Sequence, residues 1–135
     1  MHVGPVPEDL RTRARAVAEV DAAYLASVRE GTTLGEVFAA VDAYARTGFP
    51  GEERRHHQGG LAGYEPREAL AAAGSTVRIG GRKAFAFNPS VPGAKCEDTV
   101  LLDGVVEVLT AIDGWPTIEV EAGGRRWVRP GILEL

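Results

Sequence analysis

Two neighbouring histidines, His56 and His57, stand in a glycine-rich polar stretch that also contains Gly59 and Gly60. Imidazole exchanges protons near neutral pH, and glycine allows the backbone to approach a ligand closely. The stretch therefore favours a proton relay that lines a pocket. The alternative is a solvated loop in which hydrogen bonds satisfy both histidines.

Charged residues that could hold a substrate follow at two places. Arg67 has the planar donor fork that binds carboxylates bidentately, although it could equally form a helix-surface ion pair with Glu68. Glu97 precedes Asp98 in a predicted strand, where successive side chains point to opposite faces. One of these two carboxylates should therefore face inward, and Glu97 is the candidate anchor for a ligand.

Other polar and reactive side chains have structural interpretations. Asn88, Pro89 and Ser90 each favour turns, and we interpret this tripeptide as a turn. Cys96 is interpreted as inert strand packing, because no helix N-terminus near it would activate its thiol. A single cysteine excludes an intrachain disulfide and a cysteine metal cluster.

Composition predicts one compact domain over residues 1–135, since hydrophobic residues make up 44% and charged residues 25%. A net charge of -4 argues against nucleic-acid binding, which needs a clustered basic face. No apolar run is long enough to suggest a membrane span, and no signal sequence follows Met1. We therefore expect a cytoplasmic protein without nucleic-acid or membrane partners.

Apolar residues recur at three- or four-residue intervals in two stretches of the first 47 residues, which predicts two helices. The first helix should begin near Glu8 and end at Gly31. Thr33 and Glu36 have the spacing of a capping box, so the second helix should begin there and end at Gly48. A short third helix is predicted over residues 66–73.

Strand-like patterns fill the second half of the chain, over residues 76–79, 84–87, 99–102, 105–109, 117–120 and 127–128. The pair Asp103-Gly104 between two apolar runs is a strong hairpin signal, and Gly123-Gly124 predicts another hairpin. Helices followed by strands indicate an α+β domain, with the helix pair packed on one face of an antiparallel sheet.

Several motifs resemble the pita-bread metallopeptidases (aminopeptidase P, prolidase and creatinase) in their order and spacing. They are Gly31-Thr32-Thr33, the stretch from His56 to Tyr64, the stretch from Asn88 to Thr99, and Glu107-Val108-Leu109-Thr110. The resemblance covers nearly the whole chain. It implies the C-terminal half of the family's catalytic domain, with two helices on a curved antiparallel sheet.

The resemblance also implies that most metal ligands are lost. The family binds two metal ions through two aspartates, one histidine and two glutamates. Aligned with the family motifs, Gly60 takes the place of the histidine, Asn88 takes the place of one glutamate, and Glu97 matches the other. The aspartates would precede the first helix, and the chain begins past that element. Because one carboxylate cannot hold two ions, we expect no metal and no other cofactor.

Two functions follow from the resemblance. The first is a noncatalytic domain that binds a partner or a small ligand through the former pocket. The alternative is a metal-independent hydrolase or lyase acting on a small C–N substrate, as creatinase shows, with His56 or His57 as proton relay and Glu97 as anchor. A weaker third is an aminopeptidase whose metal site another chain completes. The predicted substrate-binding residues are Tyr64, Arg67, Glu68 and Asn88, with Arg67 at the place of a second family histidine.

A half-domain should present an uncovered sheet edge or apolar face. We therefore expect a homodimer, or a complementing chain that supplies the rest of the sheet. This expectation depends on Met1 being the natural start of the protein.

Overall fold

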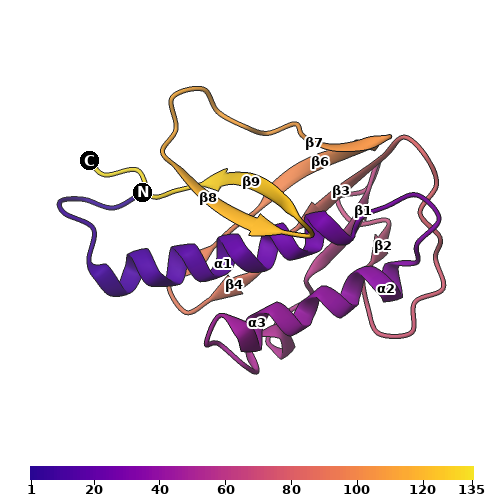
Figure 1. Ribbon diagram of the computed structural model, residues 1–135, viewed down its shortest axis with the longest axis horizontal. Helices are drawn as coiled ribbons and strands as arrows, with labels where there is room; N and C mark the ends of the chain where they lie inside the picture. The colour runs from indigo at the N-terminus through magenta and orange to yellow at the C-terminus, as the bar shows by residue number, and fades with distance from the viewer.

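The computed structural model describes residues 1–135 and has the predicted order of helices followed by strands (Figure 1). The helices are α1 (Glu8–Ser27), α2 (Leu34–Phe38), α3 (Ala43–Arg46) and the 3-10 turns η1 (Ala39–Asp42) and η2 (Glu52–Arg54). The strands are β1 (Gly59–Ala62), β2 (Ala69–Leu70), β3 (Lys83–Phe87), β4 (Ser90–Val91), β5 (Ala94–Lys95), β6 (Asp98–Asp103), β7 (Val105–Val108), β8 (Thr117–Ala122) and β9 (Arg125–Pro130).

The two predicted helices are present with altered ends. Helix α1 begins with Glu8 and Asp9, whose carboxylates suit the positive end of the helix dipole. It ends at Ser27 rather than at Gly31, because Val28 has an extended backbone. Beyond the helix, the backbone amide of Gly31 donates to the carbonyl of Ile79 instead of to a helical carbonyl. The predicted helix end was therefore four residues too late.

The capping box at Thr33 and Glu36 is confirmed. The Glu36 amide donates to Thr33 Oγ1 at 3.2 Å, and the Thr33 amide donates to Glu36 Oε2 at 2.6 Å. The second predicted helix is a run of three short segments, α2, η1 and α3, that continue without a break from Leu34 to Arg46. The reciprocal cap determines where this run begins.

The main sheet is antiparallel, with strand order β2-β1-β3-β6-β7. Both predicted hairpins are confirmed: β6 turns into β7 at Gly104, and β8 turns into β9 at Gly123 and Gly124. Both turn glycines of the second hairpin have positive φ, which a side chain would disfavour. The β8–β9 hairpin forms its own two-stranded sheet beside α1.

Two local predictions were wrong. Residues 66–73 form strand β2 between turns instead of a helix, because the Glu68 and Ala71 amides bond to the β1 carbonyls of Leu61 and Gly59. Residues 76–79 run alongside residues 31–35 and form one bridge, Thr33 with Arg78, rather than a strand of the sheet. In both places backbone pairing with another segment overrides the local sequence pattern.

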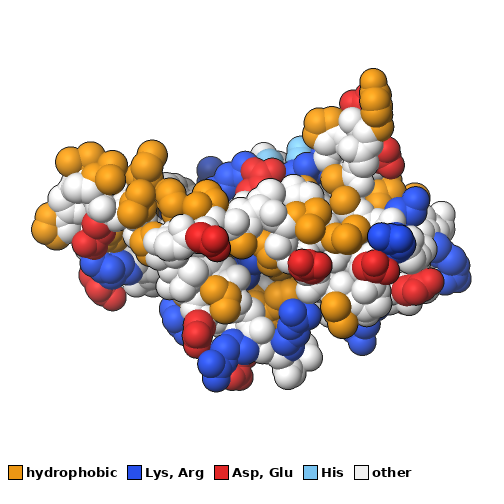
Figure 2. All heavy atoms as spheres, turned by 90° about the horizontal axis from the view of Figure 1, so that it is seen from above, with side chains coloured by type: hydrophobic (Ala, Val, Ile, Leu, Met, Phe, Trp, Pro, Cys, Tyr) orange, Lys and Arg blue, Asp and Glu red, His pale blue; other side chains and the backbone are white.

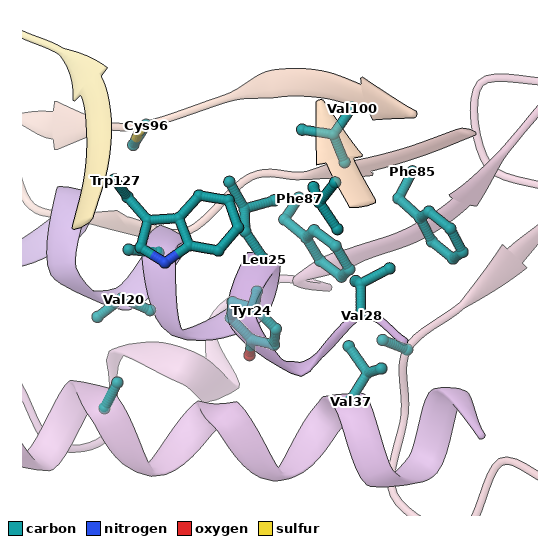
Figure 3. Close-up of a cluster of buried hydrophobic side chains, with 14 of the residues drawn as sticks. Val20, Tyr24, Leu25, Val28, Val37, Phe85, Phe87, Cys96, Val100 and Trp127 are labelled. Atoms are coloured by element: carbon teal, nitrogen blue, oxygen red, sulfur yellow. The ribbon is translucent and has the colours of Figure 1, made fainter. Parts of the chain in front are cut away.

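The core lies between the helices and one face of the main sheet. Tyr24 of α1 stacks on Phe87 of β3 with ring centroids 5.0 Å apart, and Phe85 lies 6.3 Å from Phe87. Figure 3 shows Leu25, Val100 and Trp127 gathered around this aromatic group. The helices therefore cover the sheet face that carries Phe85 and Phe87 (Figure 1).

A buried ionic cluster joins three elements beside this core. Arg129 of β9 is 1% exposed, and its Nη2 lies 2.7 Å from both Asp21 Oδ2 of α1 and Asp98 Oδ2 of β6. Burial raises the pKa of Asp21 to about 7 against the opposing effect of Arg129, and the Asp98 charge raises it further. Burial, with the nearby Asp21 charge, also raises the pKa of the Cys96 thiol, which agrees with an inert cysteine.

The raised pKa of Asp21 predicts a pH dependence of stability. Between pH 4 and 7 the folded state binds more protons at Asp21 than the unfolded state, where the ordinary value is 3.8. The contribution of Asp21 to the free energy of unfolding should therefore fall as pH rises through this range, by at most about 1.4 kcal/mol per pH unit.

Urea denaturation at several pH values would test this prediction. Asp21→Asn should lose this downward slope relative to the wild-type chain, whereas Asp113→Asn, at an exposed loop position, should keep it. Equal slopes in the wild type and in Asp21→Asn would show that Asp21 titrates normally.

Candidate functional site

One long hairpin brings the polar candidate residues to a single face. Strands β3 and β6 pair up to Phe87 with Asp98, and β4 and β5 continue the same register, in which Ser90 pairs with Lys95. Between them the Cys96 amide donates to the Pro89 carbonyl at 3.1 Å. Asn88, Ser90, Lys95 and Glu97 therefore share the face opposite to the helices.

Glu97 is held by two cations. Arg67 Nη2 lies 2.9 Å from Glu97 Oε1, and Lys95 Nζ lies 2.5 Å from Oε2. Partial burial would raise the pKa of Glu97, but the hydrogen bonds from Lys95 and Arg67 lower it overall. Glu97 is thus an ionised carboxylate whose two oxygens are already paired with protein cations.

Gly60 lies on the same face, since it pairs with Ala86 of β3. A Cβ atom at Gly60 would lie 2.7 Å from the Ala71 amide nitrogen and closer still to the Ala69 carbonyl oxygen. The backbone of β2 therefore occupies the space that any side chain at position 60 would need. No histidine fits there without displacing β2.

Asn88 and Arg67 each carry one buried polar atom without a hydrogen-bond partner, Asn88 Oδ1 and Arg67 Nε. The backbone amide of Asn88 donates to the backbone carbonyl of Gln58 at 3.0 Å, which joins the end of β3 to the segment before β1. Ser90 belongs to strand β4, so the predicted turn over Asn88, Pro89 and Ser90 is replaced by a continuation of the hairpin.

His56 is half-buried and both of its ring nitrogens have partners. Nδ1 lies 2.7 Å from the His57 carbonyl oxygen, and Nε2 lies 2.6 Å from Ser90 Oγ. The neighbouring His57 is exposed. The structure therefore brings His56, and not the His57 ring, to the polar face of the hairpin.

Buried hydrogen bonds position this segment. The Tyr44 hydroxyl donates to Gln58 Oε1 at 2.8 Å and accepts from the Ser90 amide at 3.0 Å. Gln58 Nε2 donates to the His56 carbonyl at 3.0 Å. Burial raises the pKa of Tyr44 to about 12, so its hydroxyl keeps the proton it donates. Helix α3 thereby ties the histidine segment to β4.

Tyr64 and Glu68 lie in an exposed turn. The Tyr64 side chain is 98% exposed, and Glu68 Oε1 accepts from the Tyr64 amide at 3.0 Å. Their side chains do not join Glu97, whereas Arg67 from the same turn reaches it. The structure thus gathers Arg67, Asn88, Glu97 and His56 at the hairpin and leaves Tyr64, Glu68 and His57 facing solvent.

Sequence reasoning missed the roles of Ser90 and Lys95. Ser90 was interpreted only as part of a turn, and Lys95 only as a neighbour of Glu97. The alternation of residues 88, 90, 95 and 97 around a hairpin turn at Gly93 is the signal that could have placed them on one face. Arg129 offered no comparable signal, because its partners are distant in sequence.

A groove of about 1040 Å³ begins beside Glu97 and Lys95 and runs between the β6–β7 hairpin, strand β9 and the loop after β7. Val108, Trp115 and Val128 are among its apolar lining residues. Arg125 crosses one side, where its guanidinium stacks over Trp127 and donates to the Val106 carbonyl at 3.4 Å. On the face seen in Figure 2, acidic and basic side chains are interspersed among hydrophobic ones.

The structure holds no group of three or more His, Cys, Asp and Glu side chains arranged to bind a metal ion. None of its helices combines the length and the apolar character needed to cross a membrane.

Neither the family models nor the curated proteins contain a match to this sequence. Solved structures do match it. Dipeptidase PepE from Mycobacterium ulcerans superposes with a TM-score of 0.70 at 24% identity, over 82% of this chain and 32% of its own. Prolidase from Thermococcus sibiricus superposes with a TM-score of 0.67 at 25% identity, over 82% of this chain and 32% of its own. The X-Pro aminopeptidase from Thermotoga maritima MSB8 superposes with a TM-score of 0.69 at 17% identity, over 83% of this chain and 34% of its own.

The chain has the fold of half a pita-bread domain. It spans about a third of the length of the peptidases that it matches. The expected α+β half-domain, with helices on one side of an antiparallel sheet, is confirmed.

Crowding at Gly60 yields a prediction about stability. Gly60→Ala should lower the free energy of unfolding by more than about 2 kcal/mol, because the new Cβ displaces β2 or strains β1. Gly80→Ala is the matched control, since a Cβ there meets nothing within 4 Å. Chemical denaturation measures both changes, and a Gly60→Ala chain as stable as the wild type would show that β2 yields easily.

Proposed function

We propose that this chain is a metal-depleted pita-bread-like domain without metallopeptidase activity that binds a partner or a small ligand through the former pocket. The observation that carries the proposal is the ion pairing of Glu97 with Arg67 and Lys95. A guanidinium and an ammonium already neutralise the one carboxylate that matches a family ligand, so a metal ion would have to displace both.

Two further observations support the loss of metallopeptidase chemistry. The β2 backbone fills the side-chain space at Gly60, and Asn88 presents a neutral amide where a carboxylate would serve a hard cation. Catalysis by two bridged metal ions needs several anionic oxygens in one place. The dipeptidase, prolidase and aminopeptidase activities named for the matched structures are therefore not proposed for this chain.

Titration calorimetry with Mn²⁺ and Zn²⁺ would test the proposal that the chain binds no metal ion. We expect no binding at the hairpin, and no hydrolysis of X-Pro dipeptides in the presence of either ion. Arg67→Ala and Asn88→Glu together would remove one of the two cations from Glu97 and add a second carboxylate. Metal binding by the wild-type chain that Glu97→Gln abolishes would contradict the proposal.

The binding surface that we propose is the helix-free side of the main sheet together with the adjoining groove. On this side Val105 and Leu109 are 68% and 52% exposed, with Glu107 between them. Exposed apolar side chains within a polar surround are typical of interaction surfaces. We propose a second copy of the chain as its occupant, with a complementing chain as the other outcome.

Sedimentation or light scattering over a range of protein concentrations would test self-association. Val105→Glu and Leu109→Glu should weaken the dimer at least tenfold, because each places an unpaired charge in the apolar contact. Val77→Glu is the matched control, since Val77 is 43% exposed outside the main sheet. A wild-type chain that stays monomeric at every concentration would exclude the homodimer and leave the complementing chain.

A further inference from the structure

Ser90 and His56 form a pair with the geometry of an activated hydroxyl. Ser90 Oγ lies 2.6 Å from His56 Nε2, within hydrogen-bond reach. The other ring nitrogen, Nδ1, lies 2.7 Å from the His57 carbonyl oxygen. A nucleophile, a base and a third group that orients the base are the three parts of such an arrangement.

The partners of the imidazole determine the direction of the hydrogen bonds. A carbonyl oxygen can only accept, so His56 Nδ1 carries a proton and donates it to the His57 carbonyl. In the neutral ring Nε2 is then the unprotonated nitrogen, and it accepts the hydroxyl proton of Ser90. This is the tautomer in which histidine serves a serine as general base.

The pair is held in place from several sides. The Ser90 amide donates to the Tyr44 hydroxyl, and the His56 carbonyl accepts from Gln58 Nε2. Tyr44 and Gln58 are themselves buried and bonded to each other. Ser90 and His56 are half-buried, so both are fixed by the fold and still reachable from solvent.

A lysine lies opposite Ser90 across the strand pair. Lys95 is the cross-strand partner of Ser90 and projects from the same face, with its side chain 52% exposed. An ammonium has three N–H donors, so Lys95 can hold Glu97 and also donate to an oxyanion that develops next to Ser90. This supplies the electrostatic part of an acyl-transfer site.

We propose that Ser90 is a nucleophile, with His56 as its general base, that accepts the acyl group of a carboxylic ester. Ser90 Oγ bonds to the ester carbonyl carbon while its proton passes to His56 Nε2. The tetrahedral intermediate then loses the alcohol, which takes the proton back from the imidazolium. Water, deprotonated by the same His56, attacks the acyl-serine and releases the carboxylic acid and the free hydroxyl.

The orienting group selects the substrate class. A neutral carbonyl stabilises the imidazolium that forms during the reaction less than a carboxylate does, so this pair lacks one contribution of a complete triad. Esters with good leaving groups therefore suit this pair, and peptide amides do not. The proposal goes beyond the binding role, because it uses neither the sheet surface around Val105 nor a partner chain.

Labelling of the full chain with a fluorophosphonate probe tests the assignment. Ser90 Oγ should bond to phosphorus while fluoride leaves with the proton that His56 takes, and tandem mass spectrometry should place one adduct at Ser90. Ser90→Ala should abolish it. His56→Gln keeps an amide near Ser90 that cannot take the proton, and it should slow labelling by about a hundredfold.

Matched controls separate this role from a structural one. Ser75→Ala and His2→Asn each remove a residue of the same type away from the pair, and both should label at the wild-type rate. Thermal melting should show that every variant is folded. The assignment is overturned if the folded wild-type chain stays unlabelled at Ser90, if the adduct lies elsewhere, or if His56→Gln labels as fast as the wild type. Dimer formation does not enter this readout, so each proposal can fail alone.

Discussion

The arrangement of this protein depends on one buried cation. The β8–β9 hairpin has no ladder of hydrogen bonds to the five-stranded sheet, and Arg129 connects it to both α1 and β6. Two carboxylates share this guanidinium in the interior, so removing Arg129 would leave buried carboxylates without a compensating cation. Asp98 also accepts a hydrogen bond from Thr110 at 2.6 Å, which extends the connection to the loop that borders the groove.

The same cluster anchors the register of the long hairpin. Asp98 faces Arg129 on the core side of β6, so the residues on either side of it, Glu97 and Thr99, must face the opposite way. A slip of one residue would bury Glu97 and expose Asp98. The pairing of Asp98 with Arg129 in the interior therefore determines which face of the hairpin carries Asn88, Ser90, Lys95 and Glu97. The core determines the site through register rather than through direct contact.

Local signals in the sequence predicted the elements that local physics controls. The capping box at Thr33 and the glycine hairpins at residues 104 and 123–124 needed only their neighbours, and all of them are present. Residues 66–73 and 76–79 were predicted wrongly, because their backbone groups pair with β1 and with residues 31–35, which no local pattern indicates. The resemblance to pita-bread peptidases supplied the fold, which periodicity alone left at an α+β class.

The candidate site was predictable to a smaller extent. Arg67, Asn88, Glu97 and His56 were singled out and do converge on one hairpin. Ser90 could not be recognised, because its partner His56 lies 34 residues away and the contact depends on a register that only the folded chain reveals. Crowding at Gly60 was equally hidden, since it arises from the path of β2 across the sheet.

Arg125 shields part of the exposed edge of the main sheet. Strand β7 is the last strand of its sheet, and its outward-facing carbonyl at Val106 is occupied by the Arg125 guanidinium, which stacking on Trp127 keeps in position. An intruding strand from another molecule would have to displace this charged group before it could pair along β7. The sheet can thus keep the proposed binding face open while its edge resists the indiscriminate strand addition that leads to fibres.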